Sequence, residues 1–214
     1  TTSTSCNKKS CTTTTTNYTW SGCAASRVGF NTVDTISPAY PGQMIVKNST
    51  SPCPVIPIQP LSTNFSSLKT QISNMTASGS TYVPGGLMWG WNVLSSTNPF
   101  TEGSAYDTNN RKPRKAVVLM TDGENTVSMA SDGSHTGSSQ TTADTASATL
   151  CTNMKAQKIE IFVVAFMVTN TAAKTMLSNC ATDATYYFDA ADARAFQPAF
   201  DKIAYSLRTP YLSK

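Results

Sequence analysis

Three segments of the chain have the composition of strands in a buried parallel sheet. Segments 115–121 and 159–168 contain continuous apolar runs, the pattern of strands that are covered on both faces. A shorter segment, 185–189, carries two tyrosines and a phenylalanine. We therefore expect a sheet whose strands have little solvent-facing surface.

Apolar residues spaced three and four positions apart predict helices around these strands. The expected helices cover 65–77, 84–95, 141–157 and 171–178, and a last one starts near Asp192. The first is amphipathic, with Phe65, Leu68, Ile72 and Met75 on one face. Pro198 lies about one turn inside the last helix and predicts a kink or a later start.

Strands that alternate with helices in this way predict an α/β fold with a parallel sheet flanked by helices. Ligands of such sheets bind beyond the carboxyl ends of the strands. Thr121 and Asp122 end the most apolar strand. They therefore mark the edge where a functional site is expected.

The first 61 residues follow neither pattern. Segment 1–17 is rich in Thr and Ser, lacks hydrophobic periodicity, and is expected to be an exposed arm. Segment 18–61 carries six prolines and one candidate strand, 43–46, which predicts an irregular, disulfide-tied insertion. We accordingly divide the chain into 1–17, 18–61 and an α/β part, 62–214.

Hydroxyl groups rather than charges make this chain polar. It holds 33 Thr and 26 Ser but only 13% charged residues, which favours a secreted or cell-surface protein. The net charge of +4 includes one dense basic run, 111–115, which precedes a strand and is expected to be a solvated strand entrance. No nucleic-acid partner is expected. No segment has the roughly 18 apolar residues that span a bilayer.

The six cysteines indicate an oxidising compartment. Their number is even, no CxxC pattern occurs and His135 is the only histidine, so three disulfides are favoured over a zinc site. Six cysteines allow 15 pairings. Loop closure favours neighbours in the sequence, namely Cys6–Cys11, Cys23–Cys53 and Cys151–Cys180.

Two segments resemble motifs of von Willebrand factor A domains, which have a Rossmann-like fold. Segment 117–125 is similar to a strand that ends in an Asp of the metal-ion-dependent adhesion site, and segment 79–87 is similar to the loop that carries that site's Thr. The positions that match are Asp122 and Thr81. Further segments are similar to TadG-like proteins of the bacterial Flp/Tad pilus system: 20–23 with Arg27, 87–94, 150–156, 179–181 and 186–189.

The resemblance implies a protein that binds rather than catalyses. The implied partner is a pilin, another pilus or envelope subunit, or a surface receptor, and the implied location is the bacterial envelope or the cell exterior. Oxygen ligands from Thr81 and Asp122 suit Mg²⁺, with Mn²⁺ or Ca²⁺ as alternatives. A purely structural alternative is that Asp122 belongs to a turn and Thr81 caps the following helix.

One family motif is missing from this sequence. The first motif, Asp-x-Ser-x-Ser at the end of a central strand, does not occur, and three strands are few for a doubly wound sheet. We expect the first strands to come from a preceding or separate segment. Two ligands are too few for a cation that prefers six, so metal binding is expected only when that segment supplies the first motif.

The loop after the first predicted strand contains four candidate partner contacts. Glu124 and Asn125 are expected to be exposed, and Asp132 and His135 lie in a stretch rich in Gly and Ser. A solvated loop is the simpler interpretation of all four.

Two other function classes stay open. One is a metal-free structural subunit of a surface assembly. The other is a secreted hydrolase, which is disfavoured because the sequence has neither a Gly-x-Ser-x-Gly motif nor a carboxylate pair placed for acid–base work. No catalytic residue is assigned.

Overall fold

A three-stranded parallel sheet flanked by helices forms the centre of the molecule in the computed structural model, which describes residues 1–49 and 56–208. The strand order is β5 (Ala116–Thr121), β6 (Glu160–Phe166) and β7 (Tyr187–Ala190). Each pair is parallel, with Leu119 opposite Val163 and Val163 opposite Tyr187. The predicted α/β class is confirmed.

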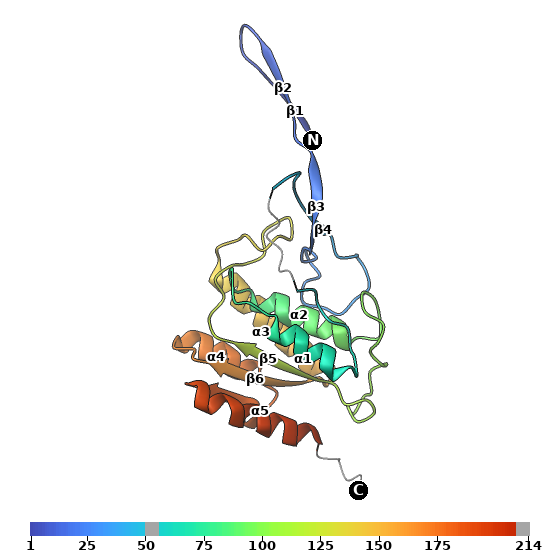
Figure 1. Cartoon of the computed structure of the whole chain (residues 1–214), viewed down its shortest axis with the longest axis vertical. Coiled ribbons are helices and arrows are strands. Elements are labelled where there is room, and N and C mark those ends of the chain that lie inside the picture. Colours follow the sequence, from blue (N-terminus) through green and yellow to red (C-terminus); the bar gives the residue numbers. More distant parts are fainter. Residues whose placement is uncertain (50–55, 209–214) are drawn as a thin grey trace.

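Helices cover the sheet on both sides. One cluster joins the sheet to α2 (Val83–Leu94), α3 (Gln140–Ala156) and α4 (Thr171–Cys180), and α5 (Ala193–Arg208) packs on the opposite face (Figure 1). All but the last residue of β6 are buried because this strand is central. The core forms where the continuous apolar runs predicted it.

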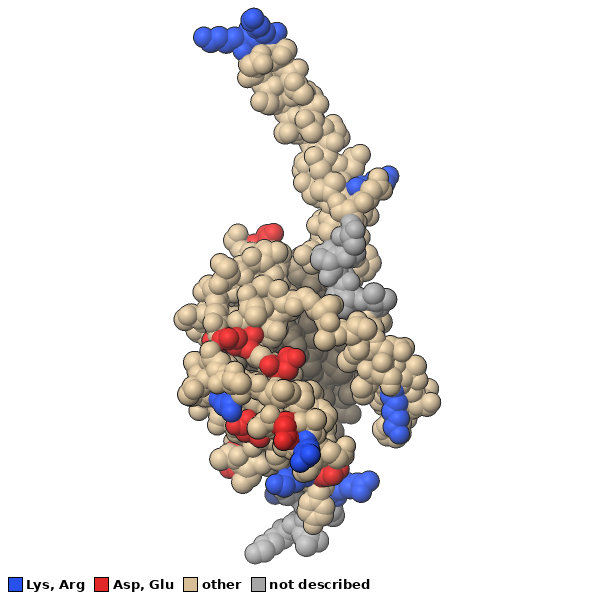
Figure 2. Space-filling model, turned by 60° about the vertical axis from the view of Figure 1, so that its left-hand side comes forward, with Lys and Arg blue, Asp and Glu red and all other residues tan. Residues whose placement is uncertain are grey.

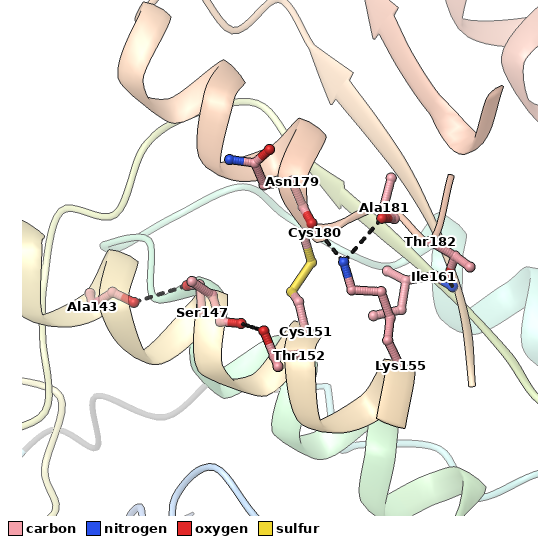
Figure 3. The surroundings of a disulfide bond; sticks show 11 residues. Ala143, Ser147, Cys151, Thr152, Lys155, Ile161, Asn179, Cys180, Ala181 and Thr182 are labelled. Carbon is pink, nitrogen blue, oxygen red and sulfur yellow. Dashed lines mark hydrogen bonds between the residues drawn. A yellow bond between two sulfur atoms is a disulfide. The ribbon is translucent and has the colours of Figure 1, made fainter. Parts of the chain in front are cut away.

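A disulfide joins the two helices that lie beside each other on this sheet. Cys151 of α3 and Cys180 at the end of α4 are bonded, with their Cα atoms 5.1 Å apart. Nearby, the Lys155 ammonium donates to the backbone oxygens of Asn179, at 2.7 Å, and Ala181, at 3.3 Å (Figure 3). A cation is favourable there because the carbonyl groups at a helix C-terminus carry partial negative charge. The predicted Cys151–Cys180 pairing is confirmed.

The exposed N-terminal segment is built as a hairpin. Strands β1 (Thr2–Cys6) and β2 (Cys11–Thr15) pair antiparallel, every residue is exposed, and the predicted Cys6–Cys11 disulfide closes the turn. Figure 1 shows this hairpin projecting away from the sheet. Alternating Thr and Ser suit a strand, although without an apolar face they give no periodic signal.

The segment that follows contains a second hairpin. Strand β4 (Gly42–Val46) corresponds to the predicted strand, and its antiparallel partner, β3 (Tyr18–Ala24), was not predicted. Trp20 lies opposite Met44, and both side chains are exposed. Cys53 lies outside the described residues, so the Cys23–Cys53 pairing stays a prediction.

Three further elements differ from expectation. Helix α1 (Phe65–Ser73) begins after Asn64, whose side chain accepts from the Ser67 N–H, but it buries no side chain, although an amphipathic pattern predicted a covered face. Helix α5 continues through Pro198, so the predicted later start is wrong. A short 3₁₀ turn, η1 (Ala184–Tyr186), occupies the start of the predicted third strand.

Among the described residues, no helix is long and apolar enough to cross a membrane.

Candidate functional site

The loop after β5 begins with a tight turn. The Thr121 hydroxyl donates to the Gly123 carbonyl at 3.0 Å and accepts from the Gly123 N–H at 3.3 Å. Asp122 lies between these residues and is exposed. The turn thus holds the Asp122 backbone while its carboxylate faces solvent.

Asn125 anchors this loop to two helices. Its side-chain oxygen accepts from the Val83 N–H at the start of α2, at 2.8 Å, and its amide nitrogen donates to the Asp144 carboxylate of α3, also at 2.8 Å. The residue is only 2% exposed. The expectation of an exposed Asn125 is therefore wrong, because both ends of its amide have partners inside the fold.

Glu124 ties the starts of two more helices together. Its carboxylate accepts from the side-chain amide of Gln140, the first residue of α3, at 2.7 Å, and from that of Asn170, the N-cap of α4, at 2.9 Å. A negative charge is favourable there because helix N-termini carry partial positive charge. Glu124 is half-buried. The expectation of an exposed Glu124 is therefore wrong as well.

Thr81 lies beside the same loop. Its N–H donates to the Thr126 hydroxyl at 2.7 Å, and its carbonyl accepts from the N–H groups of Thr126, at 3.0 Å, and Val127, at 3.3 Å. Thr126 is four residues after Asp122, so the structure brings the Thr81 loop and the Asp122 loop to one edge of the sheet. The sequence offered no signal for these backbone contacts.

Asp122 differs from its neighbours in this network. In the part of the chain that the structure describes, no hydrogen bond or ion pair involves its carboxylate, whereas Thr121, Glu124 and Asn125 all have partners. A side chain that is held at its backbone and unpaired at its carboxylate is available to a cation or to a donor on another molecule.

The oxygen chemistry around Asp122 suits a hard cation but is incomplete. Asp122 supplies a carboxylate and Thr81 a hydroxyl, both ligand types that Mg²⁺ accepts. Within residues 1–49 and 56–208, no group of three or more His, Cys, Asp or Glu side chains could hold a metal ion. No cluster of acidic, His or Cys side chains therefore accompanies Asp122 and Thr81 within the described residues.

The remaining two candidates lie further along the loop. Asp132 is exposed, and its carboxylate accepts from the N–H and hydroxyl of Ser134, which lowers the pKa of Asp132. The His135 ring packs against Tyr82 in a tilted arrangement, with centroids 4.3 Å apart, and its Nε2 lies 2.8 Å from the Ser26 hydroxyl. Burial lowers the pKa of His135.

The His135 contact connects the loop to the N-terminal part of the chain. The Ser26 N–H donates to the Gly133 carbonyl at 2.9 Å. Gly133 has φ +84°, and a Cβ there would come within 2.2 Å of the Ser26 oxygen, so only glycine fits this close approach. These contacts, across 109 positions between Ser26 and His135, could not be predicted from the sequence.

Charge is distributed unevenly over the molecule. Figure 2 shows basic side chains at the tip of the N-terminal hairpin, where Lys8 and Lys9 lie in the turn, and both acidic and basic side chains on the visible face of the α/β part. On the α/β part, Lys174 pairs with Asp189 at 2.7 Å. The hairpin tip is therefore basic, whereas the visible face of the α/β part carries both signs of charge.

The comparisons with known proteins concern the fold. The chain is similar to the crystal structure of the pilus adhesin SpaC from Lactobacillus rhamnosus GG, with a TM-score of 0.48 and 14% sequence identity. The match covers 66% of this chain and 21% of that chain, so this chain spans about a fifth of its length. No protein-family model and no curated protein matches the sequence. At this identity the similarity describes chain arrangement alone.

Proposed function

We propose that this chain is the protein-binding domain of a Tad-type pilus or a related bacterial surface assembly, acting outside the cytoplasm. The observation that carries the proposal is the display of Asp122, an unpaired carboxylate on a loop anchored to three helices. The two described disulfides support an oxidising compartment. The partner is a pilin, another envelope subunit or a surface receptor.

In this proposal, a divalent cation connects the domain to its partner. Thr81 and Asp122 supply two oxygens, the Asp-x-Ser-x-Ser motif on a further segment supplies others, and a partner carboxylate completes the set around Mg²⁺, Mn²⁺ or Ca²⁺. Glu124 and Asn125 hold the loop in position and do not contact the partner. The exposed Asp132 is the remaining direct contact.

Calorimetric titration with the three cations tests this proposal. Residues 1–214 alone are expected to bind them weakly, and a form joined to a segment carrying the first motif is expected to bind at least tenfold more tightly. In the joined form, Asp122→Ala abolishes metal-dependent binding to purified pilin. The matched control, Asp201→Ala, removes an exposed carboxylate from α5 and leaves binding unchanged.

The same titration distinguishes a metal-free structural subunit from a domain that binds its partner through a cation. A structural subunit would bind the pilin equally well in EDTA and with Asp122→Ala. Tight metal binding by residues 1–214 that is insensitive to Asp122→Ala would place the cation elsewhere, with the 123–140 loop as the next location to search.

One contact gives the hydrolase alternative a specific test. Ser26 and His135 are a nucleophile and a base at hydrogen-bond distance. Among the described residues, no carboxylate bonds to the His135 ring, so the third member of a triad is not present there. Turnover of ester substrates that is lost in Ser26→Ala would favour this class; equal rates in both forms would dismiss it.

A further inference from the structure

The Cys6–Cys11 disulfide is accessible to other molecules. Both cysteines are exposed at the end of a hairpin that projects away from the sheet (Figure 1). By contrast, Cys151 and Cys180 are each only 1% exposed. Thiol–disulfide exchange requires an attacking thiolate to reach one sulfur atom of the disulfide. Of these two disulfides, Cys6–Cys11 is therefore the one that a thiol on another molecule can attack.

Opening Cys6–Cys11 would leave the α/β body folded. The two cysteines are separated by 5 positions in the sequence, against 29 for Cys151–Cys180, and a disulfide that closes a short loop constrains the unfolded chain less. In addition, β1 and β2 bury no side chain, so no core packing depends on the bond. The bond is thus free to break and re-form in the folded protein.

The charge at the hairpin tip favours this reaction. Lys8 and Lys9 lie in the turn between the two cysteines, and Figure 2 shows the basic side chains of this tip. No acidic residue precedes Asp34 in the sequence. When a disulfide opens, one sulfur leaves as a thiolate, which nearby ammonium groups stabilise. The two lysines therefore assist the departure of either sulfur.

Hydrogen bonds hold the turn without help from the disulfide. The Asn7 side-chain oxygen accepts from the N–H groups of Lys9, at 2.9 Å, and Ser10, at 2.8 Å, and the Asn7 N–H donates to the Ser10 carbonyl at 2.9 Å. The Thr4 and Thr13 hydroxyls lie 3.1 Å apart across the two strands. Once the S–S bond is broken, these contacts keep the released sulfur beside the sulfur that it left.

This proximity selects the class of partner. A partner with a single thiol forms a mixed disulfide with one cysteine, and the neighbouring cysteine then expels it by attacking the same bond. A partner with a second thiol of its own resolves the mixed disulfide in the other direction. Only a dithiol therefore carries the exchange to completion.

We propose that Cys6–Cys11 is a thiol–disulfide exchange site that passes its disulfide to a dithiol on a partner protein. Neither Asp122 nor a cation takes part in this exchange. Its success or failure is therefore separate from that of the proposed adhesion site.

The exchange has two steps. A partner thiolate first attacks the sulfur of one cysteine; a mixed disulfide forms, the Cys6–Cys11 bond breaks, and its electron pair leaves on the other sulfur beside Lys8 and Lys9. The partner's second thiolate then attacks the partner sulfur of the mixed disulfide, and the electron pair leaves on the remaining cysteine. The partner loses two electrons and two protons and gains a disulfide, and Cys6 and Cys11 become thiols.

Two small thiols test the site. Dithiothreitol is the dithiol probe and glutathione the monothiol probe, and peptide mass spectrometry after acid quenching and alkylation identifies each product. Dithiothreitol should open Cys6–Cys11 roughly 100-fold faster than Cys151–Cys180. Glutathione should leave only a minor fraction of mixed disulfide. Equal opening rates for the two disulfides, or a glutathione adduct as the main product, would overturn the proposal.

Matched variants separate this site from a disulfide that is merely exposed. Lys8→Gln with Lys9→Gln should slow opening by dithiothreitol about fivefold at low ionic strength. The control, Lys69→Gln with Lys202→Gln, removes two exposed lysines from α1 and α5 and should leave the rate unchanged. Asn7→Ala loosens the turn and should raise the fraction of glutathione adduct about threefold. An unchanged rate in the first pair, or an unchanged fraction in Asn7→Ala, would contradict the assigned roles and overturn the proposal.

Discussion

The α/β body (83–208) and the N-terminal hairpins (1–49) are stabilised in different ways. The body contains an apolar core in which Leu150, Val163 and Leu177 are fully buried. The first hairpin buries nothing, and the second exposes Trp20 and Met44. The hairpins instead depend on the Cys6–Cys11 disulfide, backbone hydrogen bonds and the buried cation of Arg27. Equal chemical changes should therefore have unequal effects in the two regions.

Truncating a core leucine should have the largest effect. Leu150→Ala, at a residue with 0% exposure, is expected to lower the free energy of unfolding by about 4 kcal/mol, because it removes apolar contacts and leaves a cavity. Truncation to Ala at Val46 of the second hairpin, which is 44% exposed, should cost less than about 0.5 kcal/mol. Urea denaturation followed by circular dichroism measures both, and similar losses would contradict the comparison.

The two described disulfides should differ in how much each contributes to global stability, and this is the second largest expected effect. Opening Cys151–Cys180 by substitution of both residues with Ala frees a loop with a sequence separation of 29 and should cost about 3.6 kcal/mol of global stability in the chain-entropy model. Opening Cys6–Cys11 should leave the main unfolding transition unchanged and only fray the hairpin, since the hairpin is exposed and adds nothing to the core. Equal shifts in melting temperature would show that the hairpin unfolds with the body.

Arg27 provides a test within the N-terminal region. Its buried guanidinium donates to the carbonyls of Val33, Thr35 and Pro38 and stacks over Tyr40, so it organises the connection between β3 and β4. Arg27→Ala leaves these acceptors without their donor and should cost about 2 kcal/mol. Arg27→Lys should rescue little, because an ammonium cannot reproduce the guanidinium fork.

Hydrogen exchange measures the Arg27 effect. We expect faster exchange over 27–41 in both variants and unchanged exchange in β6, which lies in the body. Acceleration that extends into β6 would show that the two regions unfold together, and the separation drawn between them would be wrong.

The sequence predicted the body well because its signals are local and redundant. Continuous apolar runs located β5 and β6 to within one or two residues, and helical spacing located α2, α3 and α4. Strand β3 was missed because it carries few apolar residues at period two. The exposure of α1 was missed because spacing predicts an apolar face but not whether anything covers it.

The candidate site was predicted only in part, because only some of its residues follow a local sequence pattern. Asp122 follows a recognisable strand, so its place at the sheet edge followed from local pattern. The anchoring roles of Glu124 and Asn125 depend on Gln140, Asp144 and Asn170, and nothing in the local sequence pairs these residues. Long-range polar contacts have no periodicity, so they appear only in the folded structure.

The smallest predicted effect is a pH dependence where the two regions meet. His135 packs between Ser26 of the N-terminal region and Tyr82, the N-cap of α2. Because burial holds the pKa of His135 below its usual 6.5, the opened contact takes up a proton more readily than the closed one. The contact should therefore be fully stable above pH 6.5 and should weaken as the pH falls from 6.5 toward the lowered pKa.

The neighbouring groups do not titrate in this window. Burial raises the pKa of Tyr82 above 10.0, and hydrogen bonds from Ser134 lower that of Asp132 below 3.8. After correction for intrinsic rates, exchange over 130–137 should be faster at pH 5.0 than at pH 7.5, with β6 unaffected. His135→Gln, which keeps a polar group but cannot ionise there, should remove the difference. A pH dependence that persists in His135→Gln would assign it to another group and leave His135 a packing residue alone.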